Sequence, residues 1–352
     1  MDPMSLKKEL ISLASSQGAN LVAVARPNLW GDYVEEARAR LQETGASEED
    51  CMLSEDAMTF FEKLADVQRT LASAKSIVIL GVYSFDEEGD YGATRRKLQG
   101  KTARTYAYYP VVRQIAERVA AFITEAGYQA IQGQHIPLKY VAHEIGLGTY
   151  GWNGLLLTGD FGSYVALRAV VTDAELEPDT FEPPEPPCKD CGRCLKACPT
   201  GALYAPYKVN PALCINPLTR KADDIAQHLR QKMGNWVCGC DICQEVCPMN
   251  RSLKPRVPDP RAGFDPVHHA SHQTLGGLTR CPDLKGLLEN DRMPIMQRNA
   301  VIALANISTA EAMDMLRHCK DIDTEKLGPY VAWASDRIAQ RKGWTHDDAN
   351  RL

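Results

Sequence analysis

The stretch CKDCGRCLKACP, from Cys188 to Pro199, places four cysteines at spacings of two, two and three residues and follows the last one with proline. Further along, CGCDICQEVCP, from Cys238 to Pro248, repeats much of this pattern. The run C-x2-C-x2-C-x3-C-P is the ligand pattern of bacterial ferredoxins, whereas zinc sites usually use two CxxC pairs separated by a longer loop. The spacing therefore predicts iron–sulfur clusters rather than zinc.

The second run supplies only three ligands, so one further thiolate must come from elsewhere, and Cys214 lies between the two runs. In ferredoxins with two clusters, the fourth cysteine of each run ligates the other cluster. This rule predicts two [4Fe–4S] clusters, the first held by Cys188, Cys191, Cys194 and Cys247, and the second by Cys198, Cys214, Cys240 and Cys243. The remaining cysteines are interpreted as ordinary buried thiols: Cys51, Cys238, Cys281 and Cys319.

Composition limits the class of protein. The chain has 352 residues, 44% of them hydrophobic and 24% charged, with a net charge of −5, which is typical of a soluble protein of two or three domains. This balance gives no bulk attraction to nucleic acid or to an anionic membrane. No apolar run approaches the roughly 20 residues of a membrane span, and MDPMSLKKEL lacks the apolar core of a secretory signal. We expect a cytoplasmic protein without membrane contact, in which clustered cysteines favour metal ligation over disulfides.

Helices and strands alternate over the first part of the chain. The segment 5–18 has helical spacing after a Ser5 cap, and the runs 20–26, 76–85 and 164–173 are β-branched and typical of buried strands. The segment 111–127 predicts a helix that ends at Gly127, with Pro110 in its first turn. This alternation predicts an α/β or α+β domain built around one sheet.

Two proline-rich stretches predict domain boundaries. ELEPDTFEPPEPP, at 175–187, reads as an extended linker, and SLKPRVPDPRAGFDP, at 252–266, marks a second boundary. Beyond it, 296–307 and 330–341 have helical patterns without strand signals, as in a small repeat of the HEAT type. We therefore predict three domains, at 1–177, 178–255 and 256–352.

Glycine is dense between His143 and Asp173, in HEIGLGTYGWNGLLLTGDFGSYVALRAVVTD. Such glycines permit the backbone to approach a large ligand closely. The pattern is not GxGxxG after a strand, so it does not indicate a Rossmann nucleotide site. The alternative is a tight turn packed under the sheet.

Several motifs follow one another as in a known family. GLGTYGWNGLLL, GSYVAL, CKDCGRCLKACPTGAL, an isolated cysteine and CGCDICQEVCPMN resemble epoxyqueuosine reductases, relatives of the cobalamin-dependent reductive dehalogenases, and RNAVIALANI is similar to their HEAT-like tail. The resemblance runs from about Lys101 onward. It implies an α+β fold: a nitroreductase-like corrinoid-binding domain, a ferredoxin module with two clusters, and a C-terminal HEAT-like α-helical segment. It also implies that the clusters reduce cobalamin to the nucleophilic cob(I)alamin state, and that an epoxide on a modified wobble nucleoside of tRNA becomes the alkene, queuosine.

The resemblance also places residues in the site. The cobalamin pocket would be lined by Gly148, Tyr150, Gly151, Asn153 and Ser163. Family members carry lysine where this chain has Trp152, which points to a different pocket, and His135 is a further residue that would face it.

The proton donor is where the chain departs most from the family. Family members carry an Arg–Asp–Tyr triplet just before the helix, with the Asp as proton donor, but this chain has no aspartate between Asp90 and Asp160. KTARTYAYYPVVRQ, at 101–114, supplies tyrosines instead, and in reductive dehalogenases a tyrosine beside a cation donates the proton. The resulting catalytic candidates are Tyr106, Tyr108, Tyr109 and Arg104. The alternative is aromatic packing where the helix begins.

Three functions remain open from sequence alone. The leading hypothesis is a corrinoid and iron–sulfur reductase that resembles epoxyqueuosine reductase and acts on tRNA or on another substrate. The others are a reductive dehalogenase-like enzyme for a small organic substrate, and an electron-transfer protein that reductively activates a corrinoid partner. Expected partners are a low-potential donor of the ferredoxin or flavodoxin type and tRNA, for which 218–232 and 250–261 are the nearest basic segments. The oligomeric state is not indicated.

Overall fold

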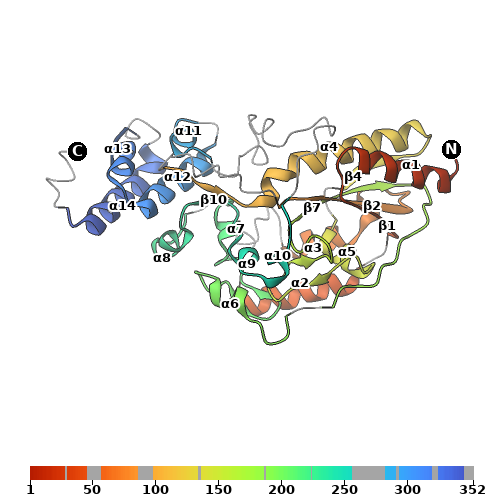
Figure 1. The fold of residues 1–352 in the computed structure, drawn as a ribbon, viewed down its shortest axis with the longest axis horizontal. Helices are drawn as coiled ribbons and strands as arrows, with labels where there is room; N and C mark the ends of the chain where they lie inside the picture. Colours follow the sequence, from red (N-terminus) through yellow and green to blue (C-terminus); the bar gives the residue numbers. More distant parts are fainter. Residues whose placement is uncertain are drawn as a thin grey trace.

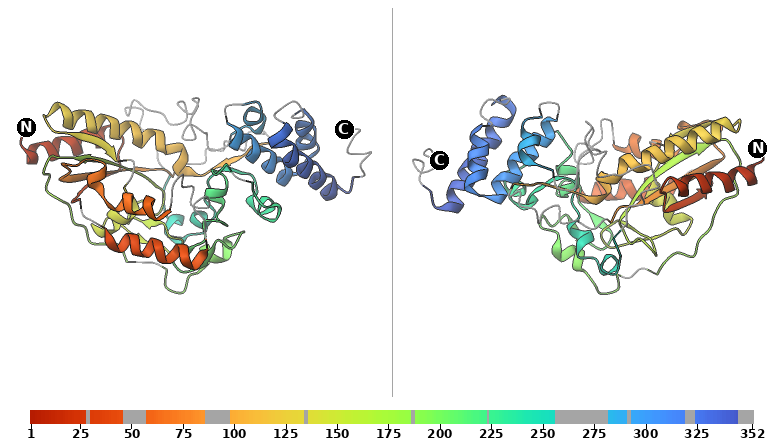
Figure 2. Two further views of the ribbon diagram at one scale, coloured as in Figure 1. Left: turned by 180° about the vertical axis from the view of Figure 1, so that it is seen from behind. Right: turned by 45° about the horizontal axis from the view of Figure 1, so that its top comes forward.

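The computed structural model describes residues 1–27, 30–45, 57–85, 98–133, 136–185, 188–222, 224–255, 282–290, 293–318 and 324–344. The molecule is elongated, with a helix-covered sheet at its N-terminal end, a bundle of helices at its C-terminal end and the cysteine segment between and below them (Figure 1). Figure 2 shows the sheet and the C-terminal helices at opposite ends in both further views. The predicted α+β class is confirmed.

The sheet has four antiparallel strands in the order β1-β2-β7-β4. These are β1 (Leu21–Ala25), β2 (Ser76–Tyr83), β7 (Val165–Thr172) and β4 (Ala130–Gly133). Their register pairs Val24 with Val78 and Ile79 with Ala169. Every residue of β2 is buried, because both faces of this strand are covered. The three strands predicted from β-branched runs are therefore confirmed.

One face of the sheet is covered by α1 (Pro3–Ser16) and α4 (Arg104–Glu125), which bury Leu6 and Leu10 against Val112, Ile115 and Val119. The predicted helix cap at Ser5 is wrong. The side chain of Asp2 instead accepts backbone N–H groups in the first turn of α1. Pro110 lies inside α4 and not in its first turn. A proline inside a helix costs one backbone hydrogen bond. The aromatic residues before Pro110 pack into two hydrophobic cores, and this packing stabilises the helix by more than the lost bond costs. The helix ends before Gly127, which has φ +96°.

The other face is covered by α2 (Gly31–Thr44), α3 (Ala57–Ala65), the short 3₁₀ turn η1 (Val67–Arg69) and α5 (Leu138–Glu144). Near α5 a small hairpin is formed by β5 (Thr149–Tyr150) and β6 (Leu156–Leu157). This hairpin contains Gly151 and Gly154 of the glycine-rich segment.

The cysteine segment is built from short elements. They are α6 (Arg193–Ala197), β8 (Leu203–Ala205), β9 (Lys208–Val209), α7 (Ile215–Leu218), α8 (Gln227–Arg230), η2 (Gln231–Met233), β10 (Trp236–Cys238), α9 (Ile242–Glu245) and α10 (Pro248–Arg251). Strand β10 pairs in parallel with β3 (Lys101–Thr102), just before α4 begins. The cysteine segment is thus attached directly to the helix that leads back over the sheet.

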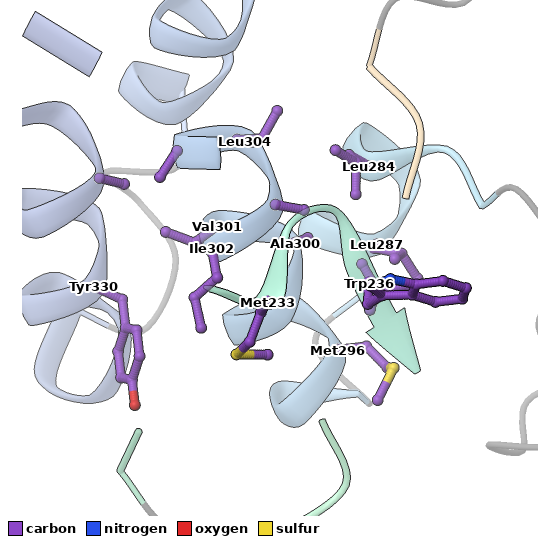
Figure 3. Packing of buried hydrophobic residues seen from close by; sticks show 14 of the residues in the cluster. Met233, Trp236, Leu284, Leu287, Met296, Ala300, Val301, Ile302, Leu304 and Tyr330 are labelled. Atoms are coloured by element: carbon purple, nitrogen blue, oxygen red, sulfur yellow. The ribbon is translucent and has the colours of Figure 1, made fainter. Parts of the chain in front are cut away.

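The C-terminal helices are α11 (Leu284–Leu288), α12 (Pro294–Ile307), α13 (Ala310–His318) and α14 (Thr324–Lys342), and the described residues from 284 to 342 contain no strand. Met233 and Trp236 of the cysteine segment pack with Leu287, Met296 and other residues of these helices in one hydrophobic cluster (Figure 3). The predicted helical character of this part is confirmed. The division into three domains stays a prediction, and this shared core spans its second boundary. Within the described ranges, no helix has both the length and the apolar composition that crossing a membrane requires.

Asn299 ties α12 to the cysteine segment and generates a stability prediction. Its fully buried Nδ2 donates to the carbonyls of Thr219, at 2.7 Å, and Val237, at 2.8 Å. Asn299→Ala leaves buried carbonyls without a donor, so we expect the free energy of unfolding to fall by about 2–4 kcal/mol. The shift of the urea and thermal midpoints measures this loss.

Asn306 on the same helix is the matched control. Its Nδ2 donates to the carbonyls of Arg230 and Gly234, both at 2.9 Å, but these contacts are partly buried or exposed, so water can replace the lost donor. We expect Asn306→Ala to cost less than about 1 kcal/mol. Equal costs for the two variants would contradict the role given to Asn299.

Candidate functional site: two cysteine sets beside a large cavity

A cavity of about 1240 Å³ lies under the sheet, on the side away from α1. Four parts of the chain form its wall: one face of α2, helix α5 with the β5–β6 hairpin, the first turns of α4 with β7, and the cysteine segment. Pockets for drug-sized ligands usually enclose roughly 300–1,000 Å³. This space, called the large cavity below, therefore suits a ligand bigger than an ordinary small metabolite.

The cysteines fall into two groups in space. Cys188, Cys191, Cys194 and Cys247, the first cysteine set, line a separate small cavity together with Trp152. Cys198, Cys214, Cys240 and Cys243, the second cysteine set, lie on the wall of the large cavity. In the described ranges no three metal-binding side chains converge closely enough to hold a single metal ion. The four cysteines predicted for each cluster line the same cavity, and the ligand assignment itself stays a prediction.

Thiols within each set raise one another's pKa, and the pKa of Cys243 of the second set is also raised by Cys194 of the first. Burial raises the pKa of Cys240, and the neighbouring thiolates of Cys214 and Cys198 raise it further. Burial likewise raises the pKa of Cys247, with added contributions from Cys188 and Cys191 of the first set. Several thiolates in each buried group repel one another, so a positively charged metal core between them would stabilise their ionised forms.

Local structure explains how each set closes. Cys198 and Cys247 follow short helical stretches in extended conformation, and Pro248 starts the next helix at its first position, where a missing N–H is tolerated. The backbone N–H of Trp152 donates to Sγ of Cys188 at 3.4 Å. Cys238 instead lies fully buried in the core around α12, and burial raises the pKa of its thiol to about 11. This placement agrees with an ordinary buried thiol, while the positions 51, 281 and 319 lie outside the described residues.

Of the five residues placed in the pocket by resemblance, four line one or both cavities and Gly148 lines neither. Tyr150, Asn153 and Ser163 line the large cavity. Gly148 and Gly151 do not; Gly151 lines the small cavity. A Cβ at Gly148 would lie 2.8 Å from the carbonyl oxygen of Leu157, so this glycine is needed for the packing of the hairpin and not for contact with a ligand.

Trp152 also lies against the small cavity and not the large one. The substitution of lysine by tryptophan therefore changes the surroundings of the first cysteine set, not the lining of the large cavity. Asn153 lines both cavities, so the backbone from Gly151 to Asn153 forms the partition between them. His135 lies outside the described residues.

Ser163 is held by the cysteine segment. Its Oγ donates to Oε1 of Gln244 at 2.8 Å and accepts from Nδ2 of Asn250 at 2.9 Å. Gln244 in turn donates to Oδ1 of Asp241 at 2.7 Å, and Oδ2 of Asp241 accepts the backbone N–H of Arg104 at 2.8 Å. This buried chain of hydrogen bonds joins β7, the second cysteine set and the start of α4.

The structure separates the three candidate tyrosines. Tyr106 and Tyr109 line the large cavity, whereas Tyr108 packs into the core between α4 and the sheet. The guanidinium of Arg104 lies over the rings of Phe85 and Tyr164. Tyr108 and Arg104 are therefore not part of the cavity lining.

Sequence reasoning missed the cation beside Tyr106. Nη1 of Arg220 donates to the hydroxyl of Tyr106 at 2.6 Å, and this hydroxyl donates to Oδ1 of Asn216 at 2.6 Å. Burial raises the pKa of Tyr106, an effect that Arg220 opposes. In the sequence, Arg220 stands out only as part of the basic segment 218–232, which suggested contact with nucleic acid and gave no indication of contact with a tyrosine.

Tyr109 stands beside this group with its ring against that of Tyr106, at a centroid distance of 5.4 Å. The guanidinium of Arg168 lies 6.0 Å from its ring. Burial raises the pKa of Tyr109, and Arg220 and Arg168 lower it in part. Tyr109 is thus a cavity-lining phenol flanked by two cations.

The opposite wall carries polar groups that the sequence did not single out. Arg40 pairs with Glu36 on α2. Nζ of Lys139 on α5 donates to the carbonyl of Gly154 at 3.1 Å, and burial lowers the pKa of Lys139. Arg40, Glu36 and Lys139 all line the large cavity, which therefore has an aromatic end and a charged side.

Comparisons with known proteins agree with this geometry. Residues 187–250 match a family described as a 4Fe-4S double cluster binding domain. An epoxyqueuosine reductase from Listeria monocytogenes is 36% identical over 57% of this chain, but the match spans only 54% of that relative. Another, from Cellulophaga algicola, is 31% identical over 68% of this chain and 76% of the relative. A crystal structure of epoxyqueuosine reductase with an epoxyqueuosine-modified tRNA-Tyr stem loop has a TM-score of 0.76 at 26% identity, covering 95% of this chain and 90% of that one.

The fold, the double-cluster domain and the adjoining cavity define an iron–sulfur oxidoreductase with two [4Fe–4S] clusters. Within that class, the chain belongs to the epoxyqueuosine reductase family.

Proposed function

We propose that this protein reduces epoxyqueuosine in tRNA to queuosine, with a corrinoid in the large cavity and electrons supplied by the two clusters. The observation that carries the proposal is the second cysteine set on the wall of the large cavity, because it puts an electron carrier directly beside a bound ligand. The cytoplasmic location expected from the sequence is part of the same proposal.

The ligand assignment is the first element of the proposal. The first cysteine set holds one cluster and the second cysteine set holds the other, so that Cys247 and Cys198 each cross to the cluster of the opposite run. The separate cavities and the coupling among thiols within each set support this assignment. Cys238 takes no part, because its side chain is fully buried in the hydrophobic core.

The large cavity fits a corrinoid in size and in chemistry. Its volume exceeds that of ordinary ligand pockets, and its wall combines an aromatic end with the charged side chains of Arg40, Glu36 and Lys139. Tyr150 and Asn153 would hold the ring system on the hairpin side, and Ser163 would act indirectly by positioning Gln244. A bound corrinoid would supply the low-potential, nucleophilic cobalt chemistry that side chains lack.

The reaction converts an epoxide to an alkene with two electrons and two protons, and it releases one water molecule. The chain supplies protons at the aromatic end of the cavity. Tyr109 is the better donor, because the hydroxyl proton of Tyr106 is already directed at Asn216. The cations of Arg168 and Arg220 stabilise the phenolate that remains on Tyr109 after proton transfer.

The tRNA substrate is supported by membership of the family and by the solved relative bound to an epoxyqueuosine-modified stem loop. The tyrosine pair in place of the family's aspartate favours a second candidate, reductive cleavage of a small organic molecule by the same machinery. Both candidates need the clusters and the corrinoid, so they differ only in the substrate.

The ligand assignment predicts separate losses of iron. Cys191→Ala should remove the first cluster and Cys243→Ala the second, so each variant should fall from about eight to about four iron atoms per chain. Cys238→Ala is the matched control and should keep about eight. Iron and sulfide analysis of anaerobically reconstituted protein measures this; full iron content in both ligand variants would refute the assignment.

The proton donor makes a second prediction. With a chemical reductant and corrinoid-loaded protein, Tyr109→Phe should lower turnover about 10²–10⁴-fold, Tyr106→Phe should lower it less, and Tyr108→Phe should stay within about twofold of the parent protein. Burial raises the pKa of Tyr109 above its usual value of 10, so the donor stays protonated at lower pH and is lost only as pH rises through that raised value. The rate of proton donation should therefore stay level between about pH 7 and pH 9. Full activity of Tyr109→Phe would exclude this role.

The function itself is tested by anaerobic incubation of the cluster- and corrinoid-loaded protein with an epoxyqueuosine-containing tRNA stem loop and a chemical reductant. We expect the mass of the nucleoside to fall by one oxygen atom. A halogenated aromatic compound serves as the alternative substrate. Turnover of that compound alone would favour the second candidate, and protein that takes up no corrinoid would overturn both.

A further inference from the structure

The two cysteine sets are not equivalent. The second set lines the large cavity, whereas the first set lines only the small cavity, on the other side of the partition at Gly151 to Asn153. Electron transfer slows steeply with distance, so the cluster remote from the reacting ligand is the one suited to take up electrons from outside. The surface over the first cysteine set is therefore where a donor would bind.

That surface is basic. Lys189, Arg193 and Lys196 are exposed, and none of them forms an ion pair with any described residue. Asp190 is the single carboxylate between Cys188 and Pro199, in a chain whose net charge is −5. We call the three cations the basic face.

The basic face adjoins the first cysteine set. Arg193 itself lines the small cavity, and Lys189 follows Cys188 in the chain. Lys196 lies one turn after Arg193 on α6, and this helix lies in the lower part of the molecule in Figure 1. Positive charge on the surface steers an acidic partner toward this point and raises the rate of its association.

We infer that the basic face is the docking site of a small, acidic, low-potential redox protein of the flavodoxin or ferredoxin type. The inference rests on the proposed cluster assignment. Each reduced partner gives one electron to the first cluster and leaves in its oxidised form, and the electron passes on to the second cluster. Two such encounters deliver the two electrons of one turnover.

Nucleic acid is the other polyanion that a basic face attracts. The position of the face favours the protein partner, since Arg193 borders the small cavity of the remote cluster, while a tRNA base undergoing reduction must reach the large cavity beyond the partition. A tRNA role for these residues is therefore an outcome that the experiment must distinguish.

The test uses the cluster-loaded protein and reduced flavodoxin as the probe. In the triple variant Lys189→Glu, Arg193→Glu, Lys196→Glu, the second-order rate constant for cluster reduction should fall at least about tenfold at low ionic strength, and its salt dependence should flatten. Bleaching by dithionite, which needs no docking, should keep its amplitude and rate. A second variant with glutamine at all three positions should show an intermediate loss, and it covers the case in which the glutamate variant loses iron.

The matched control reverses three exposed cations elsewhere: Lys8→Glu, Arg118→Glu and Lys342→Glu. It carries the same change of net charge and should keep at least half of the parental rate. An equal fall in the control and the basic-face variant, or an unchanged rate in the latter, would overturn the inference. So would weaker binding of a tRNA stem loop with normal reduction by flavodoxin. Because cluster bleaching is read without substrate, this result stands apart from whether tRNA is converted.

Discussion

The crossing of two cysteines between the runs is the constraint on which the rest of the site depends. Cys247 joins the first cysteine set although it belongs to the second run, and Cys198 joins the second set although it belongs to the first. The second set comes together only when the segment from 198 to 243 has folded, and the first only when the segment from 188 to 247 has folded. The chain meets this requirement by packing Met233 and Trp236 into the core of the C-terminal helices, which fixes the second run from behind.

The start of α4 connects this segment to the sheet. Strand β3 pairs with β10, Asp241 accepts the first N–H of α4, and the same carboxylate accepts a hydrogen bond from Gln244. Tyr106 and Tyr109 follow within the next two turns and lie in the large cavity. The start of α4, which carries these two tyrosines, is therefore joined to the second cysteine run by one buried polar network, whose members lose more when a partner is removed than isolated exposed contacts do.

Features that depend on a short stretch of sequence could be predicted from it. The β-branched runs at 20–26, 76–85 and 164–173 form strands, and cysteine spacing predicted the two groups of thiols that lie together. Contacts between distant parts of the chain were not predictable: Arg220 reaches Tyr106 from more than a hundred residues away. Pro110 was misplaced because tertiary packing of the aromatic residues extends α4 toward its N-terminus. The position of Trp152 at the small cavity was not predictable either, since one residue of shift along a turn decides which side of the partition a side chain occupies.

Because the two cavities share this partition, a change in the structure of one also affects the other. Gly151, Trp152 and Asn153 have iron-binding thiols on one side and the space for the large ligand on the other, so they are shaped by both. Oxidative damage to an inorganic centre on the outer side would therefore also disturb the wall against which the bulky inner ligand rests.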